Sequence, residues 1–165
     1  VAVVVQIAED DNRCSGGVGE RVELGRLEVA RPVAEEELGA ARVDDHVVVA
    51  VAVDIHAARD PEQALMDACD LNTRLLAVSS VNFVSVLRLD LARLGEFCRA
   101  RGILFCVDAI QQLGAIPFDV QAAQADFVAA DGHKWMLGPE GIALFYCRHS
   151  SMQQLALRQY GWHML

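Results

Sequence analysis

The chain has 165 residues, a hydrophobic fraction of 53% and a formal net charge of −9, which together indicate a folded, acidic protein of ordinary domain size. This apolar content excludes a disordered chain, and the negative charge argues against a nucleic-acid or anionic-membrane partner. Five cysteines without a C-x-x-C pair, and the lack of a signal sequence or of an apolar run of transmembrane length, predict a cytoplasmic protein with reduced thiols and no metal site. The first residue is not Met, which suggests a fragment of a longer protein.

Residues 1–60 carry most of the negative charge, with 13 acidic against 6 basic side chains. Their Val/Ala runs are separated by Gly-, Glu- and Arg-rich stretches, and the glycines of SGGVGERVELG lack the spacing and the lysine of a phosphate-binding loop. We therefore leave this acidic segment unassigned and expect it to lie outside the sheet formed by the rest of the chain. One hypothesis is that it represents GC-rich DNA translated in a non-native reading frame.

From Pro61 onward the pattern is that of an α/β domain. PEQALMDACD predicts a short helix with Pro in its first turn, and a second helix is predicted between Asp90 as N-cap and Gly102 as C-cap. Apolar runs of strand length are expected to form three adjacent parallel strands, at residues 74–80, 103–108 and 126–130. Residues 141–147 add a strand that returns antiparallel, because its connection is too short for a parallel crossover. The predicted fold is a mostly parallel sheet with flanking helices.

Polar residues follow three of these strands, and one of them, Lys134, is the only lysine of the chain. In open α/β sheets, functional groups gather beyond the carboxyl ends of the strands, so Lys134 and Asp108 are expected at one edge. A lysine amine and a carboxylate suit pyridoxal phosphate, whose aldehyde needs an amine and whose ring nitrogen needs an anion. A surface lysine and an aspartate that caps a helix are the alternatives.

The segments VDAIQQLGAIPFDV and ADFVAADGHKWMLGPEGIALFYC resemble the class V aminotransferase family of fold-type I pyridoxal-phosphate enzymes, which includes cysteine desulfurases, kynureninases and isopenicillin N epimerase-like proteins. The resemblance covers residues 61–165 and implies the central part of the large, cofactor-binding domain. It also implies a homodimer that acts on an amino acid by transamination, elimination or desulfuration. An upstream phosphate-binding turn and a downstream small domain are not visible in the sequence, so we expect the chain alone to be a poor catalyst.

The resemblance also implies roles for individual residues. Lys134 matches the Schiff-base lysine, Asp108 the partner of the ring nitrogen, and Gln111 a residue that hydrogen-bonds the phenolic oxygen of the ring. Further cofactor-binding positions are His133 at the phosphate, Asn82 near the ring, and Trp162, with Gly161, toward the cofactor of the neighbouring subunit.

Two positions depart from the family pattern. Val86 stands where relatives have a turn glycine, and a valine resists the positive φ of such a turn. Asp131 replaces a small hydroxyl residue, and we expect its charge to point away from a phosphate. Two other hypotheses stay open: an inactive relative that retains the motifs, and an acidic α/β interaction module without a cofactor.

Overall fold

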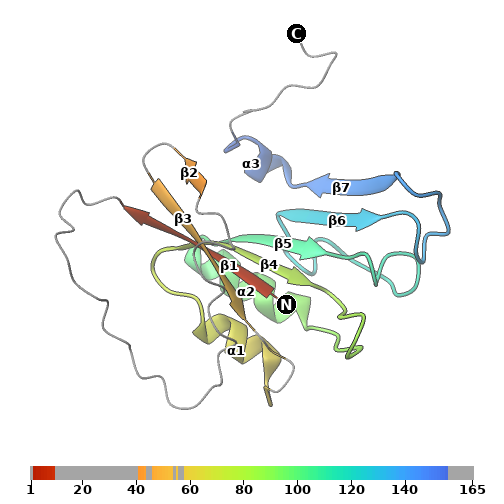
Figure 1. The fold of residues 1–165 in the computed structure, drawn as a ribbon, viewed down its shortest axis with the longest axis horizontal. Helices are drawn as coiled ribbons and strands as arrows, with labels where there is room; N and C mark the ends of the chain where they lie inside the picture. Colours follow the sequence, from red (N-terminus) through yellow and green to blue (C-terminus); the bar gives the residue numbers. More distant parts are fainter. Residues whose placement is uncertain (1, 10–40, 44–45, 54, 56–57, 156–165) are drawn as a thin grey trace, which may run out of the picture.

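The computed structural model describes residues 2–9, 41–43, 46–53, 55 and 58–155, which form one sheet with helices beside it (Figure 1). The strand order in this part of the chain is β2-β3-β1-β4-β5-β6-β7. The strands are β1 (Ala2–Glu9), β2 (Ala41–Val43), β3 (His46–Val53), β4 (Thr73–Ser79), β5 (Leu104–Asp108), β6 (Phe127–Asp131) and β7 (Ala143–Cys147).

The predicted α/β arrangement of the second part of the chain is confirmed. β4 pairs with β5, and β5 with β6, in parallel, whereas β7 returns antiparallel to β6. The connection from β4 to β5 contains a helix, which gives it the length that a parallel crossover requires. As a result the arrowheads of β4, β5 and β6 point to one edge of the sheet in Figure 1, and the loops that follow them meet there.

For residues 2–9, 41–43 and 46–53, the expectation that residues 1–60 lie outside the sheet is wrong. β1 pairs antiparallel with β4, and β3 pairs antiparallel with β1, so these strands extend the same sheet. The physical reason is that β-branched Val runs have a strong preference for strands, and the edge of β4 offers unpaired backbone groups to them. Net charge, on which the expectation depended, does not decide backbone pairing. The whole sheet is therefore mixed, and the reading-frame hypothesis stays a prediction about the coding DNA.

Both predicted helices are present, and their caps explain where they begin and end. In α1 (Pro61–Asp67) the side chain of Asp60 accepts a hydrogen bond from the backbone N–H of Gln63. In α2 (Leu91–Arg101) Asp90 accepts from the N–H of Arg93, and Gly102 closes the helix with a φ of 67°. A further short helix, α3 (His149–Met152), follows β7.

The core lies between α1, α2 and the sheet. Phe105, Leu76 and Leu94 are fully buried there, and they come from β5, β4 and α2 respectively. α2 packs closely against the segment that contains Ala123, because a Cβ atom at Gly95 would lie 2.0 Å from the carbonyl oxygen of Ala123. An Arg93–Asp60 ion pair of 2.7 Å joins the two helices at their surface. This packing fixes the strands, and hence the position of the loops at their carboxyl ends.

Candidate functional site

A cavity of about 480 Å³ lies at the carboxyl ends of β4, β5 and β6. It brings together four of the seven residues that the sequence predicts for the site: Asn82, Asp108, Gln111 and Lys134. The remainder of its lining is Ser79, Val81, Phe83, Val84 and Ile110. Asp108 and Lys134 therefore share one edge of the sheet, as expected from the strand directions.

Asp108 ends β5 with an exposed carboxylate that is held at both oxygens. The backbone N–H of Ile110 donates to Oδ1 at 3.0 Å, and the Ser79 hydroxyl donates to Oδ2 at 3.4 Å. A carboxylate has about four lone-pair sites, so acceptor capacity remains for another donor. The carboxylate is thus oriented by its own loop and by the end of the neighbouring strand.

Lys134 lies in a tight turn that follows β6. The N–H of Gly138 donates to the carbonyl of Gly132 at 2.8 Å, and the N–H of Leu137 donates to the carbonyl of Lys134 itself at 3.1 Å. The lysine is half-buried, and its Nζ lies 5.9 Å from the centre of the Phe83 ring. No carboxylate among the described residues forms an ion pair with Lys134, so the amine is not committed to a structural partner.

Two glycines allow the loops of the site to approach one another. Gly132 lies against the strand that returns, since its Cβ would be 3.0 Å from the carbonyl oxygen of Ile142. Gly114 has a φ of +91°, and its Cβ would be only 2.5 Å from the carbonyl oxygen of Trp135. The loop after β5 and the lysine turn after β6 are therefore in direct backbone contact, and only glycine fits at residue 114.

Trp135 and Phe83 are two residues of the site that sequence reasoning missed. The Trp135 indole N–H donates to Oε1 of Gln111 at 3.1 Å, and Phe83 faces the lysine from the loop after β4. Both neighbour a predicted residue in sequence, Trp135 beside Lys134 and Phe83 beside Asn82. An aromatic residue that flanks a motif was the available signal.

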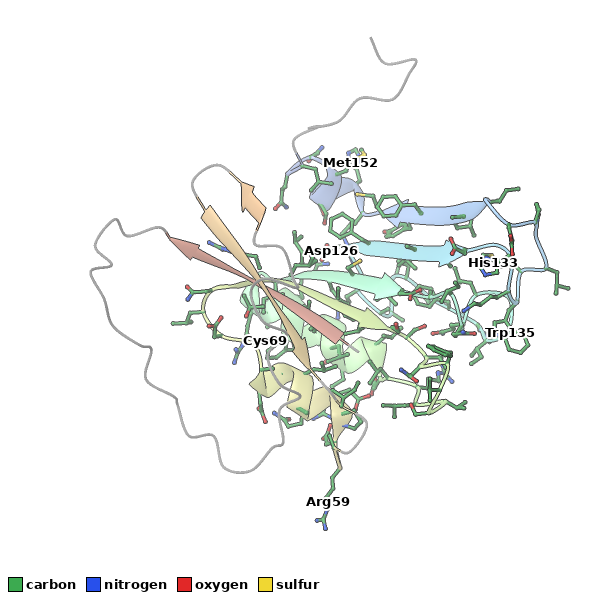
Figure 2. All side chains as sticks on the ribbon, viewed as in Figure 1. Arg59, Cys69, Asp126, His133, Trp135 and Met152 are labelled. Atoms are coloured by element: carbon green, nitrogen blue, oxygen red, sulfur yellow. The ribbon has the colours of Figure 1, made fainter. Side chains whose placement is uncertain are left out.

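The other predicted residues take separate positions. His133 is at the same edge, as Figure 2 shows, but it is exposed and does not line the cavity. Its Nδ1 lies 4.0 Å from a carboxylate oxygen of Asp131, whose side chain is 56% exposed and also lies outside the lining. Trp162 and Gly161 fall outside the described residues.

The loop that follows β4 is organised by Asn82 and strained at Val86. Asn82 Oδ1 accepts from the backbone N–H groups of Val84 and Ser85, so this side chain shapes the turn as well as lining the cavity. Val86 has a φ of 58°, the left-handed conformation that the sequence predicted for this position. A β-branched residue pays a steric cost there that glycine does not.

Three of the described cysteines, Cys69, Cys98 and Cys106, are poor nucleophiles. Burial raises the pKa of the Cys98 thiol to about 12 and the pKa of the Cys69 thiol to about 11, and it also raises the pKa of Cys106. Thiolates are the reactive form, and these groups stay protonated at neutral pH. They serve as apolar packing groups, in agreement with the sequence expectation.

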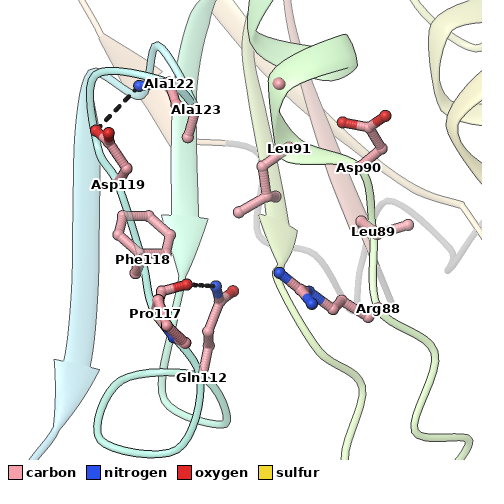
Figure 3. Close-up of a pocket in the computed structure, with 11 residues that line it drawn as sticks. Arg88, Leu89, Asp90, Leu91, Gln112, Pro117, Phe118, Asp119, Ala122 and Ala123 are labelled. Carbon is pink, nitrogen blue, oxygen red and sulfur yellow. Dashed lines mark hydrogen bonds between the residues drawn. The ribbon is translucent and has the colours of Figure 1, made fainter.

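A second cavity, of about 430 Å³, lies between the amino end of α2 and the segment that precedes β6 (Figure 3). Its polar groups largely serve the local backbone: Asp119 accepts from the N–H of Ala122, and Gln112 donates to the carbonyl of Pro117. Arg88 also lines it. This cavity contains neither Lys134 nor Asp108, so the paired amine and carboxylate belong to the first cavity alone.

Comparisons with known proteins identify the family of this chain. A model of the family "Aminotransferase class-V" matches residues 39–165, a range that begins ahead of Pro61 and includes β2 and β3. A cysteine desulfurase IscS from Shewanella baltica (strain OS223) is 38% identical over 101 residues, which are 61% of this chain and 25% of that protein. The chain thus spans about a quarter of the length of the curated relatives it matches.

Solved structures show the same likeness. An apo cysteine desulfurase from Thermococcus onnurineus NA1 superposes with a TM-score of 0.52 at 29% identity, over 60% of this chain and 24% of that one. The cystine C-S lyase C-DES, in complex with its product cysteine persulfide, superposes with a TM-score of 0.58 at 27% identity, over 62% of this chain and 28% of that one. An alanine–glyoxylate aminotransferase from Nostoc sp., at 24% identity and a TM-score of 0.52, shares the fold.

Proposed function

Because this chain belongs to the aminotransferase class-V family, we propose that its cavity holds pyridoxal phosphate and that Lys134 supplies the amine for the aldehyde of the cofactor. The observation that carries the proposal is that the only lysine of the chain and the carboxylate of Asp108 line one cavity at the carboxyl ends of parallel strands.

The residues present fit the ring end of this cofactor. When bound, pyridoxal phosphate supplies an aldehyde and a protonated pyridine ring that can accept electron density from an amino acid. The carboxylate of Asp108, fixed by Ile110 and Ser79, would hold a proton at the ring nitrogen. Gln111 would face the phenolic oxygen, and Asn82 and Phe83 would border the ring.

Lys134 has two tasks in this proposal. Its amine would hold the cofactor through the aldehyde carbon, and it would take up or return a proton at the α-carbon of the substrate. The turn closed by Gly132 and Gly138 keeps this amine at the cavity rather than in solvent. His133 is assigned to the phosphate on the family resemblance, and Trp162 to the cofactor of a neighbouring subunit.

The activity of the longer protein is part of the same proposal. We infer a cytoplasmic homodimer that acts on an amino acid, with transamination, elimination and desulfuration as the candidate reactions. Similar proteins named as cysteine desulfurases favour the third, but the buried described cysteines offer no thiolate for it. Since much of the site in such enzymes comes from other parts of the chain, residues 1–165 alone are expected to turn over an amino acid poorly.

Borohydride trapping tests the proposal directly. The chain is incubated with saturating pyridoxal phosphate, the C=N bond is reduced, and labelled peptides are identified by mass. Label is expected on the peptide that contains GHKWM, and Lys134→Ala should remove it completely.

The control for this experiment is a lysine introduced at the opposite edge of the sheet. Arg74→Lys introduces an exposed amine in β4, near its amino end and away from Asp108. Its peptide should stay unlabelled, both alone and combined with Lys134→Ala. Equal labelling of the two lysines would show that Lys134 reacts like any surface amine. This result would favour an interaction module without a cofactor.

A further inference from the structure

The Trp135–Gln111 contact fixes the orientation of the Gln111 amide. The indole N–H is a donor with no acceptor capacity, so the amide atom 3.1 Å from it must be the carbonyl oxygen Oε1. The two N–H donors on Nε2 are then directed away from Trp135. No hydrogen bond from Nε2 is present within the described part of the chain, although Gln111 lines the cavity with Lys134 and Asp108.

Backbone packing holds the two partners together. The carbonyl of Trp135 lies against Gly114, three residues after Gln111, so closely that a Cβ atom at 114 would be 2.5 Å from it. The loop that carries Gln111 and the turn that carries Trp135 are therefore in close backbone contact and cannot approach one another further. In addition, the Trp135 side chain is 55% exposed, so the core does not require its bulk.

On the premise of the proposed function, we propose that Trp135 is a positioning residue: it fixes the Gln111 amide so that the cavity presents N–H donors to an anionic oxygen of the bound ring. Without this contact the amide can rotate by half a turn and present Oε1 instead. A carbonyl oxygen repels an anionic oxygen, whereas an N–H group bonds to it with charge assistance. Trp135 thus acts through Gln111 and sets the preference of the cavity for a ring that carries an oxygen at this position.

The contact itself is tested in the chain without ligand. The indole N–H of Trp135 should exchange with solvent more slowly than a free indole, and Gln111→Met should abolish this protection. Gln111→Glu should retain it, because a carboxylate is a stronger acceptor for the same N–H. Trp162→Phe identifies which of the two indole signals belongs to Trp135. Equal exchange in the parent and in Gln111→Met would overturn the contact.

The positioning role is tested with two ligands that lack the aldehyde, pyridoxine 5′-phosphate and its 3-deoxy analogue. The ratio of their dissociation constants is measured by titration for each variant, so intrinsic differences between the ligands cancel. Relative to the parent, Trp135→Phe should reduce the preference for the oxygen-bearing ligand by about fivefold to tenfold, which is about 1 to 1.4 kcal/mol. Gln111→Glu should reduce it further, because it presents only acceptors.

Tyr146→Phe is the matched control, since it removes one polar group, a hydroxyl, from an aromatic residue of β7 that does not line the cavity. The ratio of dissociation constants for the two ligands should equal that of the parent. A preference unchanged in Trp135→Phe, with both ligands still bound, would overturn the positioning role and leave the proposed function intact. Failure of the parent to bind either ligand would overturn the proposed function, and the positioning role with it.

Discussion

Two aspartates beside neighbouring strands lie at opposite edges of the sheet and differ in burial and in hydrogen bonding. Asp126, directly before β6, has a side chain that is only 8% exposed. It accepts hydrogen bonds from the Phe105 N–H at 2.9 Å and the Ser151 hydroxyl at 2.6 Å, and it lies 3.3 Å from Arg148 Nε. Asp108, at the end of β5, is exposed and accepts two hydrogen bonds from groups in the described part of the chain.

This difference in burial and in hydrogen-bond partners indicates that Asp126 is a structural carboxylate and that Asp108 is available to a ligand. A buried charge is tolerated only when donors and a counter-charge surround it, and Asp126 has both. In this way it ties β5, β7 and α3 together at the amino edge of the parallel strands, away from His133 and Trp135 in Figure 2. Asp108 retains acceptor capacity and shares a cavity with the only lysine, so the carboxyl edge of the parallel strands is the one suited to bind and activate a ligand.

The largest expected effect is on stability, from Asp126→Ala. The change leaves the Phe105 N–H without its acceptor and removes the counter-charge of Arg148, which is three-quarters buried and keeps its hydrogen bonds to the Ala125 carbonyl. Breaking such a buried pair costs about 3 to 5 kcal/mol of unfolding free energy, measured by urea denaturation. Binding of pyridoxal phosphate per folded molecule should be unchanged.

Asp108→Ala provides the contrast to this variant. It removes the same side chain from an exposed position, so its stability should fall by about 1 kcal/mol or less. Cofactor retention should instead decrease. Equal destabilisation by both substitutions would show that the two carboxylates do not have the separate roles described above.

A smaller effect, of the opposite sign, is expected from Val86→Gly. Val86 is exposed and has a φ of 58°, a conformation that costs an L-residue about 1 to 2 kcal/mol. Glycine removes this strain but has a larger entropy in the unfolded chain. We expect a net gain of about 1 kcal/mol in urea denaturation, whereas Val84→Gly, in the same loop without a positive φ, should give no gain. A loss of stability in Val86→Gly would mean that the loop is not strained.

The sequence predicted most of the second part of the fold, because caps and apolar runs are local signals. Asp90, Gly102 and the four strands from β4 to β7 were all identified in this way. The pairing of β1 with β4 was missed, since pairing between distant strands depends on an open edge that only the assembled sheet reveals. Composition and charge gave the wrong expectation there.

The site could be predicted only in part, for a related reason. Lys134 and Asp108 were placed together because parallel strands share a carboxyl edge. Trp135 was missed because its role comes from a contact across 24 residues. Its place beside the lysine motif was a signal for the site, but it did not indicate that Gln111 is the partner.

The most direct test of the account is to map where pyridoxal phosphate binds on the whole chain. Backbone amide signals are followed by NMR while the cofactor is titrated, with inorganic phosphate as the control ligand. The account predicts that the large shifts are confined to the loops at residues 79–84, 108–114 and 132–138, and that the signals of Asp126, Arg148 and Ser151 stay in place. Shifts centred on the Asp126 edge, or the same shifts with inorganic phosphate alone, would contradict a pyridoxal-phosphate site at Lys134.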